Sequence, residues 1–371
     1  MSASTDRFRG SGKGRVVAAL TSLTLSMSLA ACGGGDEGSN KTLVYSSSIA
    51  ETTSLGQADN AWLDSVEAAD VGITFERTFG GALVPLVEIL PAVADGTVDA
   101  GFINDGAFPQ QLPLYTISQM PFVTADPYAQ MMALQKLYEE NAAFQAEWEK
   151  QGVHVLHFLP VGAGLMGSAD AVDDLGDLTG QRLRAFGLLA EASAEIGADP
   201  VDLPFAELFE SLERDVIDGY AGMSLDVAHS LGFTKLRAHL TDFGTGSYSS
   251  TAAIINLDTW NSLSEEQQAA MEEVTAGAWT QEALDILEKV EAEACAGLAE
   301  VGASLSSLPD TEKSAFKDRV GALLQSSWTS SVTDAGVSAD DAASVLADYQ
   351  KFTAEFEAET IYDSDRSACQ G

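Results

Sequence analysis

The sequence predicts an α/β protein of two lobes, with one long helix that spans both. Three observations support this prediction. Strand-like and helix-like segments alternate along the chain. The roughly 330 residues that remain after removal of an export segment suggest two lobes rather than one core. A stretch of about 38 residues with helical spacing would extend roughly 55 Å, which is longer than one lobe.

The alternation runs through the chain without an internal repeat or a low-complexity insert. Strands are expected at residues 42–46, 73–79, 98–103, 153–159 and 182–186. Helices are expected at 53–68, from about residue 84 to a bend at Pro91, at 127–150, and after residue 186 through Ile196.

The long helix is expected to begin at Ser264, where Ser264 and Gln267 fit a capping box. Beyond this box, apolar residues from Met271 to Val301 recur at helical spacing and no proline intervenes. We therefore expect one continuous helix shared by two lobes.

The N-terminal segment predicts export. Basic residues at 7, 9, 13 and 15 precede an apolar run at 16–31, which is too short to span a bilayer comfortably. The run ends in LAAC at residues 29–32, which resembles the lipobox of bacterial lipoproteins and implies lipidation of Cys32 after cleavage. The alternative is an ordinary signal peptide followed by an incidental cysteine. Residues 33–40 are glycine-rich and polar, as in a flexible tether.

The composition excludes several partners. The chain carries 19 basic and 56 acidic residues. Removing residues 1–31 deletes four basic residues and Asp6, which leaves 15 against 55 and a net charge of −40. We therefore expect neither nucleic acid nor a bare anionic lipid surface as a partner. Salt screens charge within roughly 8 Å, so a few groups inside a cleft can still bind an anion.

Two further cysteines, Cys295 and Cys369, would meet an oxidising compartment. They either pair, and so pin the C-terminal tail to a helix, or remain free thiols. The sequence leaves both possibilities open.

Two motifs suggest a dinucleotide site and a metal site, but their surroundings in the sequence argue against both. GAGLMG at 162–167 matches a dinucleotide-binding pattern, but an acidic segment follows it without a clear helical stripe. His154 and His157 lie at an odd separation within an expected strand, so their side chains should point to opposite faces rather than share a metal. We expect no cofactor, no metal site and no catalytic residues.

Several short segments together resemble the substrate-binding proteins of tripartite ATP-independent periplasmic (TRAP) transporters, of the C4-dicarboxylate-binding type. Each is weak alone, but their order and spacing cover roughly residues 41 to 300. They are YSSSIAE at 45–51, GGAL at 80–83, DGTVD at 95–99, MPF at 120–122, DLTGQRLR at 177–184, GADP at 197–200, LPFAEL at 203–208, VIDG at 216–219 and NLDTWNSL at 256–263.

The resemblance implies a periplasmic-binding-protein-like fold, with the ligand between two α/β lobes. The boundaries expected on this basis are 1–31 for the lipoprotein signal peptide, 32–40 for the tether, 41–161 with 248–287 for lobe I, 162–247 with 288–345 for lobe II, and 346–371 for a C-terminal helix and tail.

The resemblance also implies that Arg184 grips a ligand carboxylate, which suits a planar, permanently charged guanidinium. Arg182 would share its strand face and competes for this role. Glu88 corresponds to a carboxylate in the pocket wall. The other expected ligand-binding residues, at strand ends that would face the cleft, are Ser47, Ser48, Asn104, Phe186 and Tyr248.

Two departures from the family narrow the ligand. Many relatives carry a second Arg where this chain has Gly164, and an Asn where it has Gly222. Both changes should remove polar groups and add room. We therefore expect a monocarboxylate or a bulkier, more apolar organic acid rather than a succinate-like ligand.

The expected function is that of an extracytoplasmic, membrane-anchored lipoprotein, monomeric and not an enzyme. It would bind a small organic acid by closing its lobes and deliver it to a sodium-driven TRAP permease. Two alternatives remain at this point: a binding lipoprotein of an ATP-driven importer, and an exported enzyme that acts on an organic acid.

Overall fold

The computed structural model describes residues 40–363 and Cys369. The predicted signal peptide, most of the predicted tether and the predicted lipidation site at Cys32 lie outside the described residues. Among the helices that are described, none is both long enough and apolar enough to cross a membrane.

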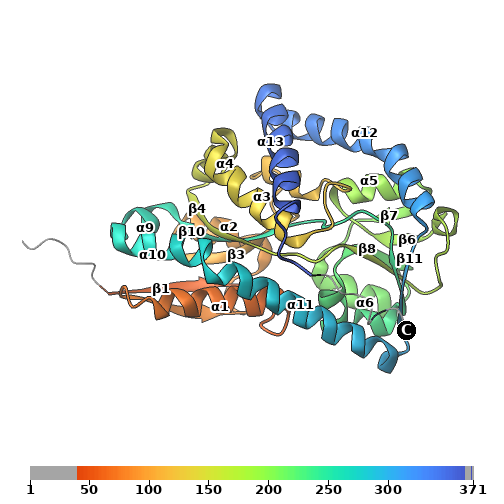
Figure 1. The fold of residues 1–371 in the computed structure, drawn as a ribbon, viewed down its shortest axis with the longest axis horizontal. Coiled ribbons are helices and arrows are strands. Elements are labelled where there is room, and N and C mark those ends of the chain that lie inside the picture. Colours follow the sequence, from red (N-terminus) through yellow and green to blue (C-terminus); the bar gives the residue numbers. More distant parts are fainter. Residues whose placement is uncertain (1–39, 364–368, 370–371) are drawn as a thin grey trace, which may run out of the picture. The chain divides into compact units, whose positions relative to one another are not determined.

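The first sheet has five strands in the order β2-β1-β3-β10-β4 (Figure 1). Its strands β1, β2 and β3 are parallel, whereas β10 runs antiparallel to both β3 and β4. The bounds are Lys41–Ser46 for β1, Ile73–Thr78 for β2, Ala100–Asn104 for β3, Val153–Leu159 for β4 and Thr251–Asn256 for β10.

The second sheet has six strands in the order β11-β9-β5-β8-β6-β7. Strand β6 is parallel to both β7 and β8, and β5 is antiparallel to β8 and β9. The bounds are Leu165–Ser168 for β5, Arg182–Arg184 for β6, Asp199–Val201 for β7, Gly219–Met223 for β8, His239–Asp242 for β9 and Ser304–Ser307 for β11.

Three connections carry the chain between the sheets. They join β4 to β5, β9 to β10, and β10 to β11, the last through the helical segment 257–303. The first two touch each other, because Ala163 pairs with Ser247 in an isolated bridge and the Gly164 amide donates to the Gly246 carbonyl at 2.9 Å. All strands of the first sheet thus come from 41–161 and 248–287, although the lobe boundaries themselves stay a prediction.

The helices cover the faces of both sheets (Figure 1). Their bounds are Ser54–Ala68 for α1, Leu86–Ala94 for α2, Pro127–Glu140 for α3, Ala142–Lys150 for α4, Gly187–Glu195 for α5, Leu208–Glu213 for α6, Leu225–Ser230 for α7, Phe233–Leu236 for α8, Leu257–Asn261 for α9, Glu265–Ala276 for α10, Ala278–Leu298 for α11, Asp310–Asp334 for α12 and Ala339–Glu357 for α13. Short 3-10 turns are η1 Leu114–Gln119, η2 Leu175–Leu178, η3 Phe205–Glu207 and η4 Ala299–Val301.

Two expected helices are each divided in two. The helix expected at 127–150 breaks at Asn141, which is extended (φ −100°, ψ 107°) and whose side chain caps α4 by accepting from the Phe144 amide. The long helix breaks at Gly277 (φ −104°, ψ −138°), since glycine is the weakest helix former after proline. The expectation of one continuous helix is therefore wrong.

Of the two halves of the expected long helix, α11 is the one that contacts both parts of the chain. Its 21 residues span about 31 Å. It packs on α1 beside the first sheet and on α7 beside the second. The boundary predicted between residues 345 and 346 falls inside α13, which Ser338 caps, and it stays a prediction.

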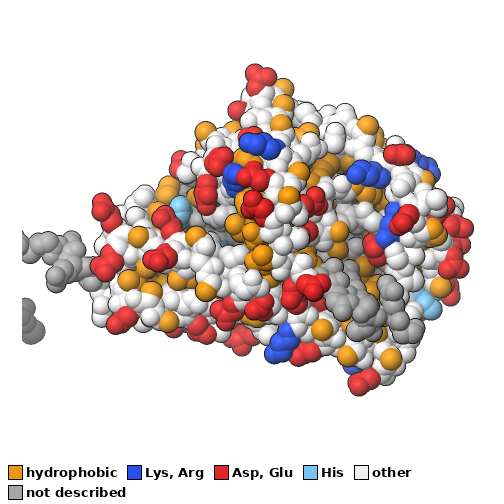
Figure 2. Space-filling view, in the orientation of Figure 1, with side chains coloured by type: hydrophobic (Ala, Val, Ile, Leu, Met, Phe, Trp, Pro, Cys, Tyr) orange, Lys and Arg blue, Asp and Glu red, His pale blue; other side chains and the backbone are white. Residues whose placement is uncertain are grey.

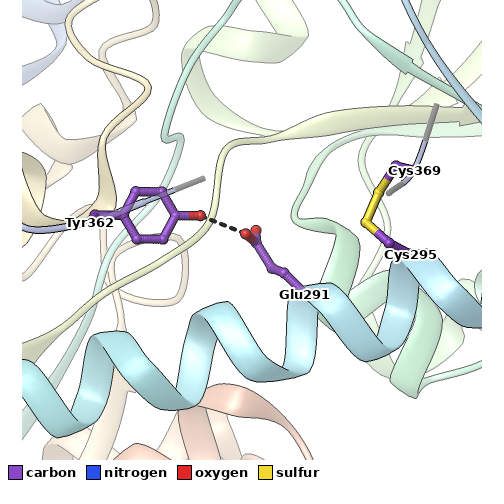
Figure 3. Close-up of a disulfide and its surroundings, with 4 residues drawn as sticks. All are labelled: Glu291, Cys295, Tyr362 and Cys369. Carbon is purple, nitrogen blue, oxygen red and sulfur yellow. Dashed lines mark hydrogen bonds between the residues drawn. A yellow bond between two sulfur atoms is a disulfide. The ribbon is translucent and has the colours of Figure 1, made fainter. Parts of the chain in front are cut away.

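The C-terminal tail returns to α11 (Figure 3). Cys295 and Cys369 form a disulfide. The Tyr362 hydroxyl donates to Glu291 at 2.5 Å, and the Asp363 amide donates to Glu288 at 2.8 Å. Three side chains on one helix thus hold the tail beside the helix that contacts both sheets.

The apolar interior forms two clusters, and neither is confined to one sheet. One cluster joins Ile103 and Phe158 of the first sheet to Leu183 of the second. The other joins Tyr45 of the first sheet to Tyr220 of the second. Each cluster therefore contains residues from both sheets.

Candidate functional site

Polar and charged side chains gather where parallel strands end. In the first sheet β1 runs into Ser47 and Ser48, and β3 ends at Asn104. In the second sheet β6 ends at Arg184, two residues before Phe186. The carboxyl ends of the strands are where open α/β sheets bind their ligands.

Arg184 is a guanidinium without a protein partner. Within residues 40–363 and Cys369 its side chain makes no hydrogen bond or ion pair, and its Nε atom is buried and unsatisfied. The guanidinium carbon lies 4.8 Å from the centre of the Phe186 ring. Burial lowers the pKa of Arg184, against smaller opposing effects of Tyr248 and Asp202. A buried polar group left unpaired is costly, so this arginine is poised to bind an anion.

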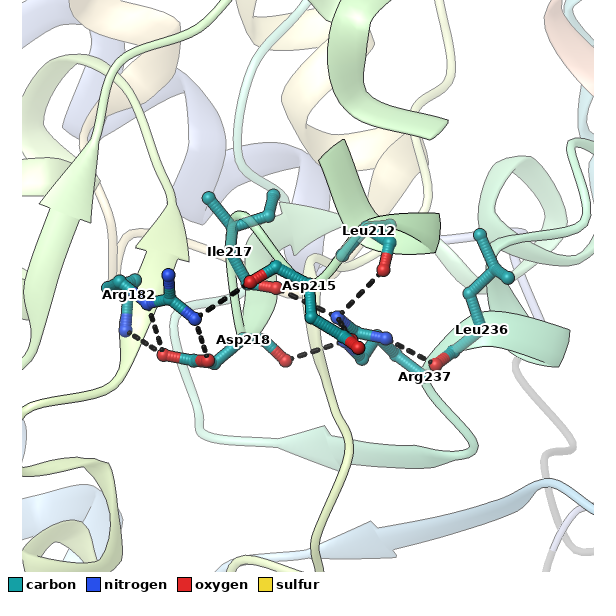
Figure 4. A network of polar contacts seen from close by, with 7 residues as sticks. All are labelled: Arg182, Leu212, Asp215, Ile217, Asp218, Leu236 and Arg237. Carbon is teal, nitrogen blue, oxygen red and sulfur yellow. Dashed lines mark hydrogen bonds and ion pairs between the residues drawn. The ribbon is translucent and has the colours of Figure 1, made fainter. Parts of the chain in front are cut away.

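Arg182, the competing arginine, is already engaged (Figure 4). Its Nε and Nη2 atoms donate to Asp218 at 3.0 and 2.5 Å, and Nη2 also donates to the Asp215 carbonyl. This pairing raises the pKa of Arg182 and lowers the pKa of Asp218. Arg182 therefore links β6 to the turn before β8, and its Nε and Nη2 atoms are not available for paired hydrogen bonds to a ligand carboxylate.

Phe186 and Tyr248 form the aromatic part of the site. Their ring centres lie 5.4 Å apart in an edge-on arrangement. The Tyr248 hydroxyl donates to the Phe186 carbonyl at 2.6 Å and accepts from the Leu189 amide at 3.2 Å. Burial raises the pKa of Tyr248, which stays a neutral donor. Tyr248 thus fixes the turn between β6 and α5.

Asn104 lies near the Phe186 ring, and Gly106 is the residue that separates them. A Cβ atom added to Gly106 would lie 2.9 Å from Cε2 of Phe186 and 3.6 Å from Oδ1 of Asn104. The absence of a side chain at Gly106 therefore lets the end of β3 meet Phe186. The structure brings Arg184, Phe186, Tyr248 and Asn104 together.

Among the described residues, no hydrogen bond or ion pair joins the remaining candidates to Arg184. Ser47 is buried with an unsatisfied hydroxyl, and its carbonyl accepts from the Gly81 amide at 3.0 Å. Ser48 is partly buried beside Gly81. Glu88 lies exposed in the first turn of α2. Their roles as ligand-binding residues stay predictions.

The expected extra room at Gly164 and Gly222 is not present. A Cβ atom on Gly164 would lie 3.0 Å from the Gly222 Cα atom, so these two backbones pack together. A Cβ atom on Gly222 would lie 2.6 Å from Leu189 Cδ2 and 3.0 Å from Tyr248 Cδ1. Apolar side chains fill the space that an amide would need, so the expectation of added volume is wrong.

Three contributors to the site were not predicted from the sequence: the N-terminal amides of α5, Gln119 and Leu189. Helix α5 begins directly after Phe186, at Gly187 (φ +54°), and its N-terminal amides favour anions. Oε1 of buried Gln119 would clash with any side chain at Gly187, and Leu189 donates to Tyr248. The only sequence signal for Gln119 is its place before the MPF segment.

The motifs that were set aside have ordinary structural surroundings. The second half of GAGLMG forms strand β5 rather than a helix. His154 stacks on Trp260 at 4.0 Å, whereas His157 lies between Trp62 and Trp279. Across the described part of the chain, no group of three or more His, Cys, Asp or Glu side chains could hold a metal ion.

The cavities that stand out lie away from Arg184. One of about 600 Å³ lies between α3, β4 and the region of the α10–α11 break. Another of about 230 Å³ lies between α12, α13 and the MPF segment. Neither is lined by any of the seven predicted ligand-binding residues.

The end of β3 in the first sheet lies beside Phe186, and the unpaired Arg184 of the second sheet stacks on the same ring, as expected for a two-lobed solute-binding protein. Residues 45–331 match the family of bacterial extracellular solute-binding proteins, family 7 (DctP). The chain belongs to this family, which comprises the solute-binding proteins of TRAP transporters. It is therefore a periplasmic transport protein and not an enzyme, and the two alternatives left open above are set aside.

Individual proteins are similar to this chain, and the solved structures among them share its fold. The outer membrane transporter protein TsaT of Comamonas testosteroni is 26% identical over 263 residues, which cover 69% of this chain and 78% of TsaT. A TRAP solute-binding protein of Rhodoferax ferrireducens, solved with copurified benzoate, is 19% identical with a TM-score of 0.75; the match covers 86% of this chain and 99% of that one. Another from Bordetella bronchiseptica, solved with (R)- and (S)-mandelate, is 23% identical with a TM-score of 0.72 and coverage of 85% and 99%.

Proposed function

We propose that this protein binds an apolar, preferably aromatic, monocarboxylate at Arg184 and delivers it to a TRAP permease. The observation that carries the proposal is the unpaired guanidinium of Arg184, buried at Nε and stacked on Phe186. A carboxylate can accept two parallel hydrogen bonds from such a fork. The amides at the start of α5 add a second favourable interaction with negative charge.

The apolar surroundings support the choice of an aromatic acid. Phe186 lies next to Arg184 and Tyr248, and Tyr248 and Leu189 lie next to Gly222. The second arginine of this strand, Arg182, is already paired with Asp218. A second carboxylate would therefore be desolvated without a partner, which is costly. Benzoate and mandelate, found in the two solved relatives, have the expected chemistry.

The surface charge does not oppose this proposal. Acidic side chains greatly outnumber basic ones on the face shown in Figure 2. Their repulsion of an organic anion is screened over roughly 8 Å in physiological salt, whereas Arg184 acts at contact distance.

Delivery requires a conformational change and a partner. In the proposal, contacts from both lobes favour a closed state, since a ligand shifts such an equilibrium only through its higher affinity for that state. Helix α11, which packs on α1 and α7, bends as the lobes approach. The closed monomer, anchored by lipidated Cys32, then docks on a permease driven by a sodium gradient.

A thermal-shift screen against organic acids, followed by calorimetry, tests the binding step. Protein unfolded and refolded to remove copurified ligand should be stabilised by benzoate or mandelate more than by succinate. Saturation at a hundred times Kd corresponds to about 2.7 kcal/mol of stabilisation. Binding should be lost in Arg184→Gln and retained in the control Arg182→Gln. Tight succinate binding, or full binding by Arg184→Gln, would refute the proposal.

A further inference from the structure

A buried carboxylate lies one residue beyond the site residue Asn104. Asp105 is 1% exposed, and its carboxylate accepts from the Ser118 hydroxyl at 2.5 Å, the Ser249 hydroxyl at 2.5 Å and the Ser250 amide at 3.0 Å. The Asp105 amide also donates to the Ser250 carbonyl at 3.2 Å. A carboxylate is an acceptor without donors, which matches this set of donors.

Two of these partners belong to the connection from β9 to β10. Ser249 has a φ of +78°, a left-handed conformation that is unfavourable for residues other than glycine. Its hydroxyl is held by Asp105, and the adjacent Ser250 amide is held by the same carboxylate. Asp105 therefore offsets the cost of the conformation that this connection adopts.

The residue before Ser249 is Tyr248, which reaches into the site. Its hydroxyl joins the Phe186 carbonyl to the Leu189 amide, at 2.6 and 3.2 Å. Leu189 is the third residue of α5, where no earlier helical carbonyl can accept its amide. Tyr248 thus holds the turn that carries Arg184 and the ring on which Arg184 stacks.

We propose that Asp105 is a positioning residue for the ligand site. It fixes Ser249 and Ser250, these set the direction of Tyr248, and Tyr248 holds the β6–α5 turn with Arg184 and Phe186. Asp105 lies at the end of β3 in the first sheet, whereas Arg184 ends β6 in the second. The linkage therefore sets the distance between the anion-binding group and Asn104. This inference rests on the function proposed above.

A matched pair of serines separates positioning from general stability. Ser118 and Ser249 donate to Asp105 at the same distance, but only Ser249 adjoins Tyr248. Ser249→Ala removes the contact that holds the left-handed residue. Ser118→Ala removes a contact of the same length to the same carboxylate on the η1 side, where the Ser118 hydroxyl also lies 2.8 Å from the Tyr115 carbonyl. Asp105→Ala would remove both but endangers folding, so the serine variants carry the test.

The first measurement is hydrogen–deuterium exchange of the Leu189 amide by NMR, in ligand-free protein. Ser249→Ala should accelerate this exchange roughly tenfold, because Tyr248 is the only acceptor for that amide among the described residues, whereas Ser118→Ala should leave it unchanged. Equal acceleration in both variants, or none in Ser249→Ala, would overturn the inference.

The second measurement is benzoate affinity. Ser249→Ala should weaken binding roughly tenfold, because a misplaced guanidinium loses its paired geometry, and Ser118→Ala should change binding less than threefold. Unchanged affinity in Ser249→Ala overturns the positioning role. If wild-type protein binds no organic acid, the proposed function fails, but the exchange measurement still decides whether Asp105 fixes Tyr248.

Discussion

Replacing Arg184 by Met should make the ligand-free protein more stable while it destroys binding. In the structure the Arg184 side chain makes no hydrogen bond to any described residue, and its Nε atom is buried. An unsatisfied buried polar group costs about 1–3 kcal/mol. The lost contact between the guanidinium and Phe186 is worth about 0.5–2 kcal/mol, and a methionine sulfur recovers about 0.3–1.5 kcal/mol against the same ring. From the middle of these ranges, the expected net gain is about 1.5 kcal/mol.

The matched control is Arg182→Met, for which the opposite sign is expected. Arg182 pairs with Asp218, and the two side chains are 43% and 36% exposed, so solvent screening limits the loss to about 0.5–1 kcal/mol. Urea unfolding of ligand-free protein measures both variants. Calorimetry with benzoate should show binding lost in Arg184→Met and retained in Arg182→Met. A clear loss of stability in Arg184→Met would refute the reasoning, since it would mean that Arg184 already has a partner.

Three further predictions concern other parts of the molecule. Burial raises the pKa of Asp59 from 3.8 to about 7, against smaller opposing effects of Tyr45 and Arg77. The resulting stability is present below pH 4 and lost as the pH rises through 7. The unfolding free energy of wild type relative to Asp59→Asn should therefore fall by about 2.3 kcal/mol between pH 5 and 7 in urea titrations, and a constant difference would contradict this. Alkylation should label Cys295 and Cys369 only after reduction, and Cys295→Ser should lower the unfolding free energy by about 2–4 kcal/mol, whereas labelling without reduction would show free thiols. Cys32→Ser should release the protein from membranes on fractionation, and continued membrane association would exclude lipidation at that residue.

The order of elements could be read from the sequence because its signals are local. Strand β4 has the expected bounds of 153–159, and Thr53 caps α1 where the helix was expected to begin. The two helix breaks were missed although their residues are visible. Asn141 and Gly277 each sit inside an apolar pattern that continues on both sides, so periodicity alone conceals the interruption.

The site was only partly predictable because its decisive contacts are distant in sequence. Arg182 is paired and Arg184 is not, because the Asp218 carboxylate binds Arg182 and not Arg184. Asp218 lies 36 residues from Arg182 in the sequence. The space beside Gly222 is filled by Leu189 and Tyr248, a contact that no local pattern reports. The positioning role proposed for Asp105 likewise depends on a contact with Ser249, which is distant in sequence.

The most direct test of the account is a crystal structure of the protein with benzoate. The account predicts both carboxylate oxygens within hydrogen-bond distance of the Arg184 guanidinium, and the ligand ring beside Phe186 and Tyr248. A ligand held instead by Arg182, or seated in the cavity of about 600 Å³ between α3 and β4, would contradict the central claim.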